Sequence, residues 1–158
     1  MRNRRMLHLA GLLAFLLQAA SCTDSALVDT NKPISNRNWS YINKITVPVT
    51  ITDASKNYQV SFNLRHTSDY KYSNIFIVLS LTGPGLTPYK QRKEFQLAWP
   101  DGEWLGSGSG NLYSYQMPLT ETFRFPAKGT YTFVIEQNMR DNPLREISDV
   151  GLRVAPIE

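Results

Sequence analysis

Side chains that could do catalytic chemistry are few in this sequence, and their spacing does not favour an active site. The run His66-Thr67-Ser68-Asp69 contains the residue types of a hydrolytic triad, but contiguous residues cannot easily converge on one attacking oxygen. Asp101 and Glu103 are a carboxylate pair, and glycosidic acid–base chemistry needs two carboxylates facing each other across a substrate. These two lie only two residues apart around a Pro-Asp-Gly turn signature, so a turn is the better interpretation. We therefore predict no catalytic residues and no enzyme activity.

Metal and phosphate sites have equally little support in the sequence. A zinc or redox-metal site needs several His or Cys ligands, and the chain has two histidines and one cysteine. The segment 101–103 offers too few oxygen ligands for a calcium loop. The glycine-rich run 106–110 lacks the lysine and the helix that follow a phosphate-binding loop. It predicts a flexible or tightly turned loop that can adapt to a partner, and we predict no metal and no cofactor.

Aromatic side chains outside the alternating segments are the main candidates for binding. Trp99 and Trp104 flank the turn just described, while Tyr70 and Tyr72 precede a strongly apolar segment. Aromatics are usually core residues, but exposed ones anchor protein interfaces and stack on sugar rings. Arg140 lies in a segment of loop character, where it either binds loop carbonyls or contacts a partner. The candidate partner-contact residues are Trp99, Trp104, Tyr70, Tyr72 and Arg140.

The N-terminus has the layout of a secretory signal. Three arginines lie within residues 2–5, an apolar run follows at 7–17, and small residues at 19–21 precede Cys22. The apolar run is about half of the roughly 20 residues needed to span a bilayer. Ala19-Ala20-Ser21-Cys22 resembles a lipobox, although Ala19 stands where Leu is usual. We predict removal of residues 1–21 and lipidation of Cys22, which attaches the chain to a membrane.

The predicted cleavage leaves a nearly neutral chain that begins with a polar segment. Of the 17 Lys and Arg residues, three leave with the signal, so 14 cations remain against 13 anions. This balance gives no electrostatic reason to bind nucleic acid. Residues 23–38 are polar, contain Pro33 and show no apolar periodicity. We therefore predict a flexible tether over 22–38 and a folded domain over 39–158.

The segment from residue 39 onward predicts one β-strand after another. Residues 45–52, 60–65 and 130–137 alternate apolar and polar side chains. Residues 74–81 are nearly all apolar, which predicts a central strand covered on both faces, and Pro48 predicts an edge strand or a bulge. Further strands are expected at 92–98, 111–117, 121–125 and 150–155. The fold prediction is a single all-β sandwich of about eight strands, with jelly-roll or immunoglobulin-like connectivity left open.

Four sequence blocks carry a resemblance to a known family. They are NLRHTSDY at 63–70 followed by YSN at 72–74, PDGEWLGSG at 100–108, FPAKGTYTF at 125–133, and EQNMR at 136–140 with DVGLR at 149–153. In this order they resemble the gliding-motility lipoprotein GldH family of the Bacteroidetes. The resemblance implies a part in the envelope machinery for gliding motility and the linked type 9 secretion system, with partners among its other envelope proteins. It attaches no activity or cofactor, and because the family also occurs in relatives that do not glide, motility of the source organism does not follow.

The leading functional prediction is a non-catalytic, lipid-anchored protein-interaction module. The alternative is a carbohydrate-binding lipoprotein, because β-sandwiches with aromatic loop residues often bind glycans. Surface lipoproteins of these bacteria tend to carry an acidic cluster after the lipidated cysteine, and here only Asp24 follows Cys22 closely. We therefore expect an outer-membrane location that faces the periplasm.

Overall fold

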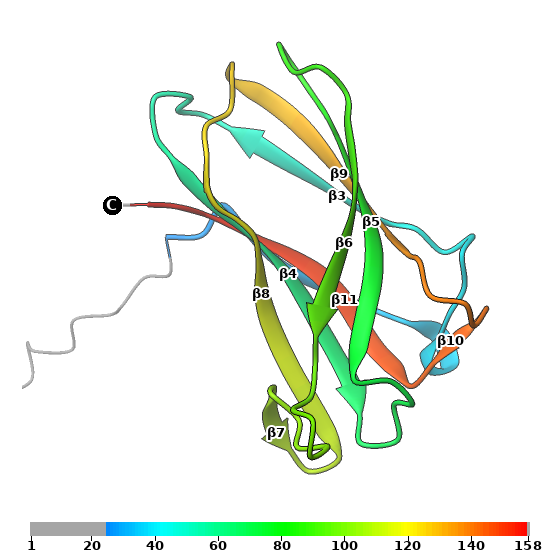
Figure 1. Cartoon of the computed structure of the whole chain (residues 1–158). Helices are drawn as coiled ribbons and strands as arrows, with labels where there is room; N and C mark the ends of the chain where they lie inside the picture. Colours follow the sequence, from blue (N-terminus) through cyan, green and yellow to red (C-terminus); the bar gives the residue numbers. More distant parts are fainter. Residues whose placement is uncertain (1–24, 158) are drawn as a thin grey trace, which may run out of the picture.

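The computed structural model describes residues 25–157 as two antiparallel sheets packed face to face (Figure 1). One sheet has the strand order β1-β11-β4-β8-β7 and the other β3-β9-β5-β6, and β2 and β10 form a short separate ladder. The strands are β1 Val28–Pro33, β2 Asn38–Trp39, β3 Ile45–Ile51, β4 Tyr58–Thr67, β5 Asn74–Thr82, β6 Tyr89–Gln96, β7 Ser107–Ser109, β8 Leu112–Phe123, β9 Gly129–Gln137, β10 Leu144–Arg145 and β11 Ile147–Pro156, and a 3-10 turn, η2, spans Ser35–Arg37.

The strand pairing shows jelly-roll connectivity. β5 pairs with β6, and this hairpin lies inside three longer-range antiparallel pairs, β4 with β8, β3 with β9, and β1 with β11. Successive pairs fall alternately on the two sheets, which is the arrangement of a jelly roll rather than of an immunoglobulin domain. The all-β sandwich prediction is confirmed, and the choice that the sequence left open is decided by the long-range pairs.

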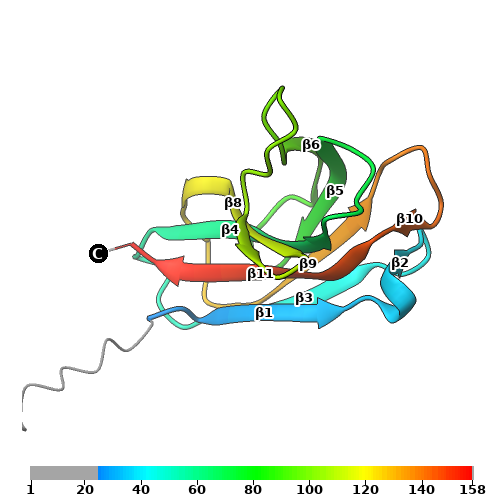
Figure 2. The same cartoon turned by 90° about the horizontal axis from the view of Figure 1, so that it is seen from below.

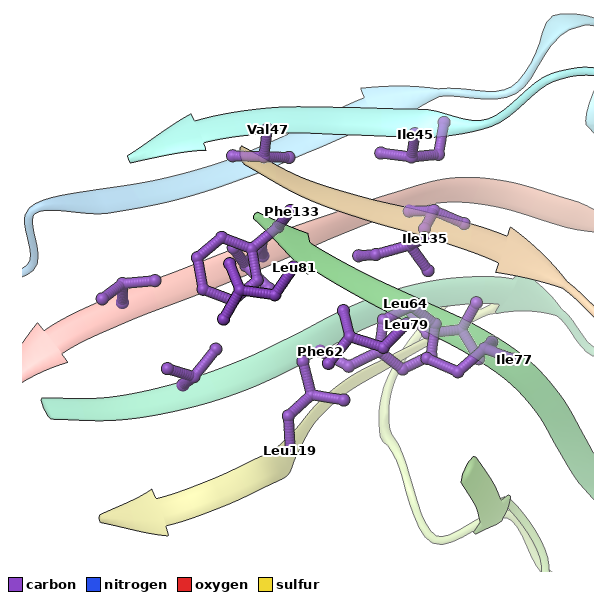
Figure 3. Packing of buried hydrophobic residues seen from close by; sticks show 14 of the residues in the cluster. Ile45, Val47, Phe62, Leu64, Ile77, Leu79, Leu81, Leu119, Phe133 and Ile135 are labelled. Carbon is purple, nitrogen blue, oxygen red and sulfur yellow. The ribbon is translucent and has the colours of Figure 1, made fainter. Parts of the chain in front are cut away.

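The core lies between the sheets, as Figure 3 shows for part of it. On β3 and β9 the inward side chains are those predicted from the alternation, and every second residue is buried. β5 buries every second residue as well. Phe62 and Leu64 on β4 face Leu79 and Phe133 across the gap in the close-up view (Figure 3). The chain has one cysteine, so no disulfide within it stabilises the fold. Packing can supply the stability, since burying one large apolar side chain contributes about 1.5–3 kcal/mol.

Two strand predictions have different outcomes. β3, which contains Pro48, pairs only with β9 and is the edge strand of its sheet, so the edge prediction is confirmed. β5 is central in its sheet, but only its inward side chains are fully buried, so the expected cover on both faces is wrong. Its outward Phe76 is half-buried because the guanidinium of Arg92 lies 3.7 Å from the ring centroid. The long apolar run therefore reflects a face covered by neighbouring side chains and not by a further layer.

The tether prediction is wrong for residues 28–38. β1 pairs along its whole length with β11, from Val28 opposite Val154 to Pro33 opposite Asp149 (Figure 2). Ile34 is buried, and Trp39, the first residue of the predicted domain, is completely buried in the core. A strand at the edge of a sheet is held by backbone hydrogen bonds, so its outward side chains can stay polar. Of the predicted tether, residues 22–24 lie outside the described part of the chain.

The sandwich has two distinct ends. Leu27 donates its backbone N–H to Val154 O, and Ile157 donates to Asn57 O, so both ends of the described chain lie together (Figure 1). We call this the anchor end. The loops 68–73, 97–111 and 138–146 lie at the opposite end, where β4 ends and β6 leads into β7, and we call it the hairpin end (Figure 1). Within residues 25–157, no helix has the length and apolar character needed to cross a membrane.

Candidate contact site at the hairpin end

The segment between β6 and β7 is a tight hairpin whose tip carries Trp99. An isolated bridge pairs Ala98 with Trp104, and Leu105 donates its N–H to Leu97 O at 2.9 Å. Gly102 donates to Trp99 O at 2.9 Å and has φ +91°, a conformation that glycine adopts without strain. The turn predicted from Pro-Asp-Gly is therefore confirmed. These bonds fix the position of the loop by its backbone and leave its outer side chains free for contact.

The outer side chains of this hairpin are unusually apolar for an exposed loop. Trp99 is 52% exposed and Leu105 is 40% exposed. Asp101 and Glu103 lie between them, both exposed, and no cation in the described part of the chain forms an ion pair with either carboxylate. Asp101 also accepts the backbone N–H of Glu103 at 3.1 Å, which stabilises the turn. An exposed tryptophan is among the side chains that most often anchor protein interfaces.

An aromatic cluster around His66 supports the hairpin from below. The His66 ring is completely buried. Its centroid lies 4.5 Å from the Trp104 ring, 4.9 Å from Tyr70, 5.2 Å from Tyr115 and 6.0 Å from Tyr113. Such contacts contribute beyond simple area burial, by about 0.5–1.5 kcal/mol per pair. Trp104 therefore fixes the hairpin to the sandwich, while Trp99 is 52% exposed and has no ring contact with the described aromatic side chains.

The structure separates the predicted tyrosine contacts into a buried and a surface residue. Tyr70 is only 4% exposed and its hydroxyl donates to Asn74 O, so it supports the cluster and cannot itself contact a partner. Tyr72 is half-buried and lies below Lys71, whose ammonium is 5.1 Å from the ring centroid and 3.5 Å from Asp141 Oδ2. The Tyr72 hydroxyl, with a smaller effect of Lys71, lowers the pKa of the Asp141 carboxyl. The prediction for Tyr70 is wrong because its ring completes the core.

Arg140 lies in the loop between β9 and β10, at the same end of the molecule. The loop is fixed by Gln137, whose Nε2 donates to Asp141 O and whose Oε1 accepts from Met139 N–H. Arg140 is exposed, and its guanidinium makes no hydrogen bond or ion pair with any described residue. The interpretation that it binds loop carbonyls is therefore wrong within residues 25–157, and Arg140 stays a candidate for partner contact.

The hydrogen bonds of His66 identify it as a structural group. Its Nδ1 lies 2.8 Å from Thr67 O, so this nitrogen carries the hydrogen and donates it. Its Nε2 lies 3.1 Å from the Tyr115 hydroxyl, which also lies 2.8 Å from Leu97 O. Burial lowers the pKa of the His66 imidazole, with the Thr67 carbonyl opposing this. Burial also raises the pKa of Tyr115 to about 12. The network joins β4 and β8 to the base of the hairpin, and it offers no nucleophile.

We expect the stability of the domain to fall below neutral pH because of His66. Its pKa is lower in the folded chain than the 6.5 of an unfolded one, so the unfolded state binds the proton first as pH falls. Above pH 6.5 the neutral His66 makes its full contribution to the free energy of unfolding. That contribution is lost as the pH falls from 6.5 towards the folded-state pKa, by up to about 1.4 kcal/mol per pH unit. Denaturant unfolding between pH 7.5 and 5 measures this. The His66→Phe variant, which keeps a ring, should show a smaller slope, and an equal slope would contradict the assignment.

The described residues contain no group of three or more His, Cys, Asp or Glu side chains arranged to hold a metal ion. Cys22 lies outside the described part of the chain. The glycine-rich run 106–110 forms β7 and its turn into β8, with Ser107 opposite Ser114, so it is a tight hairpin as one of the two predictions for it stated. What this end of the molecule offers chemically is contact: an exposed indole, an exposed leucine and unpaired charges on rigid supports.

Sequence reasoning did not predict that His66 and the tyrosines of β8 would support the hairpin. Tyr113 and Tyr115 alternate with polar Ser114 and Gln116, a spacing that could have placed both rings on the inner face. Leu105 follows Trp104 directly, and opposite sides of a strand alternate residue by residue. Once Trp104 is known to face inward, Leu105 must face outward.

Comparison with known proteins places the chain in a family. The model of the GldH lipoprotein family matches residues 26–154. A "Gliding motility lipoprotein GldH homolog" from Christiangramia forsetii is 29% identical over 142 residues, which cover 85% of this chain and 86% of that protein. "Gliding motility lipoprotein GldH" from Flavobacterium johnsoniae is 28% identical over 160 residues, covering 97% and 96%.

Among solved structures, the insecticidal delta-endotoxin Cry8Ea1 from Bacillus thuringiensis aligns with a TM-score of 0.46 and 16% identity, over 82% of this chain and 22% of that one. A likeness at this level does not establish a shared fold. The family match includes β1, which the sequence had predicted to lie in the tether, and ends within β11, so it covers the two strands that pair at the edge of the five-stranded sheet. This chain belongs to the GldH lipoprotein family.

Proposed function

We propose that the chain is a non-catalytic, lipid-anchored component of the envelope machinery for gliding motility and the linked type 9 secretion system. It acts by binding another protein of that machinery through the hairpin end. Cys22 carries the lipid, and the domain lies on the periplasmic side of the outer membrane. The names of the two relatives and the family match support a role in gliding-related machinery. The observation that carries the binding role is the rigid hairpin that exposes Trp99 and Leu105.

The pairing of β1 with β11 limits how far the domain can lie from its lipid. Leu27 is already bonded to Val154, so only residues 23–26 separate Cys22 from the folded sandwich. Whatever their conformation, five Cα steps span at most about 17 Å. The anchor end is then held near the membrane. β4 is 10 residues long, and at about 3.3 Å per residue it places the hairpin end roughly 30 Å further out.

The hairpin also indicates the chemistry of the partner surface. An indole and a leucine side chain need an apolar pocket, because they contribute affinity only when water is removed from around them. Asp101 and Glu103 beside them need cations on the partner's rim, which raise the rate and specificity of association more than the affinity. We propose a partner with an apolar pocket bordered by Lys or Arg.

Replacing Cys22 tests the anchored part of this proposal. In the Cys22→Ala variant we expect no labelling by radioactive palmitate, no signal cleavage, and loss of both gliding or secretion function and co-purification with envelope proteins. A Ser21→Ala variant, which leaves the cysteine in place, is the control and should behave like the unchanged chain. Normal processing, location and function of Cys22→Ala would contradict the proposal.

A second candidate function, glycan binding, is favoured by a polar groove of about 340 Å³ on the outer face of the five-stranded sheet. Its floor is fixed: Asn63 Nδ2 donates to Asp29 and Asn63 Oδ1 accepts from Gln116 Nε2. The Asn31 side chain on the rim makes no hydrogen bond with the described residues, so its amide can both donate to and accept from sugar hydroxyls. Retention on polysaccharide gels that is lost in Asn31→Ala would support this function, and no retention on any gel would exclude it.

A further inference from the structure

A second cavity lies between the two sheets, on the side where the sandwich is open. It has a volume of about 320 Å³. At Leu119–Phe123 β8 is the edge of its sheet, because β7 pairs only with Ser114–Leu112 further along. β6 is the edge of the other sheet. The mouth therefore opens between two strand edges.

The walls of this cavity are apolar and reach into the core. They include the buried Leu79, Leu81 and Phe133 on one sheet and Val60 and Leu119 on the other. The half-buried Leu86, in the connection between β5 and β6, and the exposed Tyr89, the first residue of β6, also line it. A concave, mostly apolar site with a few polar groups is the usual form of a small-molecule site.

One cation lies in this apolar lining. Lys93 shares the inward face of β6 with Phe95, whose ring packs 5.5 Å from Phe62. Lys93 Nζ donates to Leu119 O at 2.7 Å across the gap between the sheets. Within the described part of the chain no carboxylate lies within ion-pairing distance of it. An ammonium with two remaining donors and no counter-ion, beside an apolar cavity, favours an anionic head on an apolar ligand.

The cavity also lies in the half of the molecule that holds the chain's attachment. Thr120 and Phe123, which line it, pair with Val60 and Tyr58 near the anchor end. On the outer face of the same piece of β8, Glu121 and Thr122 border a groove with Ser25, the first described residue. Only one strand thus separates the cavity from the segment that leads towards Cys22. The supply of lipid to the cavity rests on the proposed function, in which Cys22 carries the lipid and holds this end of the domain near the membrane.

We propose that this cavity binds one fatty acid, with its alkyl chain between the sheets and its carboxylate on Lys93. The binding is non-covalent and goes beyond the proposed docking function, and it stands whether or not the hairpin binds a partner. The inward lysine could otherwise serve only to discourage edge-to-edge pairing of β6, as charges on edge strands often do. A ligand preference that depends on Lys93 distinguishes the two roles.

Photolabelling tests the proposal on the full chain in lipid nanodiscs, in lipidated form and as Cys22→Ala. The probe is a 16-carbon fatty acid with a diazirine in mid-chain, and labelled peptides are mapped by mass spectrometry. We expect label on residues 79–93 and 117–123 in both forms. Leu86→Trp, which fills the mouth, should lower this label about tenfold or more, whereas the control Leu105→Trp at the hairpin end should leave it unchanged.

The role of Lys93 has its own comparison, which does not depend on how Leu86→Trp folds. In Lys93→Met, labelling by the acid should fall about tenfold, as expected when a charge-assisted hydrogen bond is lost, while labelling by the matching diazirine alcohol stays the same. If Lys93→Met lowers labelling by the acid and by the alcohol equally, or lowers neither, the proposal is overturned. Label in the cavity of Cys22→Ala alone would show that the chain's own acyl group fills it, and crosslinking to a second chain there would show a protein occupant, either of which would also overturn it.

Discussion

The Trp99→Ala variant is expected to bind the envelope partner about 30-fold more weakly while it unfolds at an unchanged temperature. A buried tryptophan anchor contributes about 2 kcal/mol or more to an interface, and every 1.4 kcal/mol is a factor of ten in the dissociation constant. The fold should not change because the bonds that fix the hairpin at this point are from the backbone: Trp99 N–H donates to Glu103 O and Gly102 N–H to Trp99 O. The dissociation constant for the partner, and a thermal unfolding curve, measure both parts.

Ile42→Ala is the matched control for this variant. Ile42 is 85% exposed, the highest of the exposed large apolar residues in the described part of the chain. It lies in the connection between β2 and β3, where Tyr41 is bonded to Met139 and Asn142 of the 138–146 loop and not to the hairpin that carries Trp99. Ile42→Ala should leave the dissociation constant for the partner within about twofold of that of the unchanged chain, as for most surface changes. Trp104→Ala would be a poor probe, since that ring packs on His66 and its removal should destabilise the fold. Weaker binding of Ile42→Ala together with normal binding of Trp99→Ala would contradict the assigned site.

The Gly151→Ala variant is expected to lose about 3 kcal/mol or more of its free energy of unfolding and to release β1. A Cβ atom at Gly151 would lie 1.7 Å from Thr30 O and 2.7 Å from Thr30 C. These are backbone atoms, so no rotamer change can relieve the clash and β1 must move as a strand. The spacer between lipid and domain would then lengthen, and the domain would no longer be held near the membrane.

Denaturant unfolding and hydrogen exchange of the amides of residues 27–33 measure this effect. Gly108→Ala is the control, because the nearest atom to its added Cβ is the end of the Tyr113 ring at 3.3 Å, which can move. We expect that control to change stability by less than about 1 kcal/mol. Slow exchange in β1 of Gly151→Ala, with normal stability, would mean that β1 is not held as described.

The sequence predicted the strands whose inner and outer faces differ. β3 and β9 were found because one face is buried and the other is not, which gives a period of two. β4 was found because its side chains alternate between apolar and polar, although the outward Ser61 and Asn63 are buried as well. β1 was missed because backbone pairing holds it and its exposed side chains are polar. β6 was predicted about three residues late, since its inward row contains Lys93 in place of an apolar residue. Edge strands whose side chains are mostly polar, such as β1, therefore cannot be found from apolar alternation alone.

The candidate site was predictable only in its exposed part. Trp99 follows the segment of β6 and precedes a turn signature, so its exposure follows from local sequence. The burial of Tyr70 does not, because it depends on His66, Trp104 and Tyr115 meeting from three separate segments. Those contacts are set by the nested strand pairs, which bring His66 next to Tyr115, 49 positions along the chain, and which no local pattern encodes.

Crosslinking in living cells from the hairpin tests most directly whether this domain works by contact at that end. A photoreactive amino acid replaces Leu105, and in a second strain it replaces Lys56 in the turn at the anchor end. The account predicts that position 105 captures one envelope protein reproducibly, and that the crosslink disappears when Trp99→Ala is added. Capture of the same protein from position 56 but not from position 105 would contradict it.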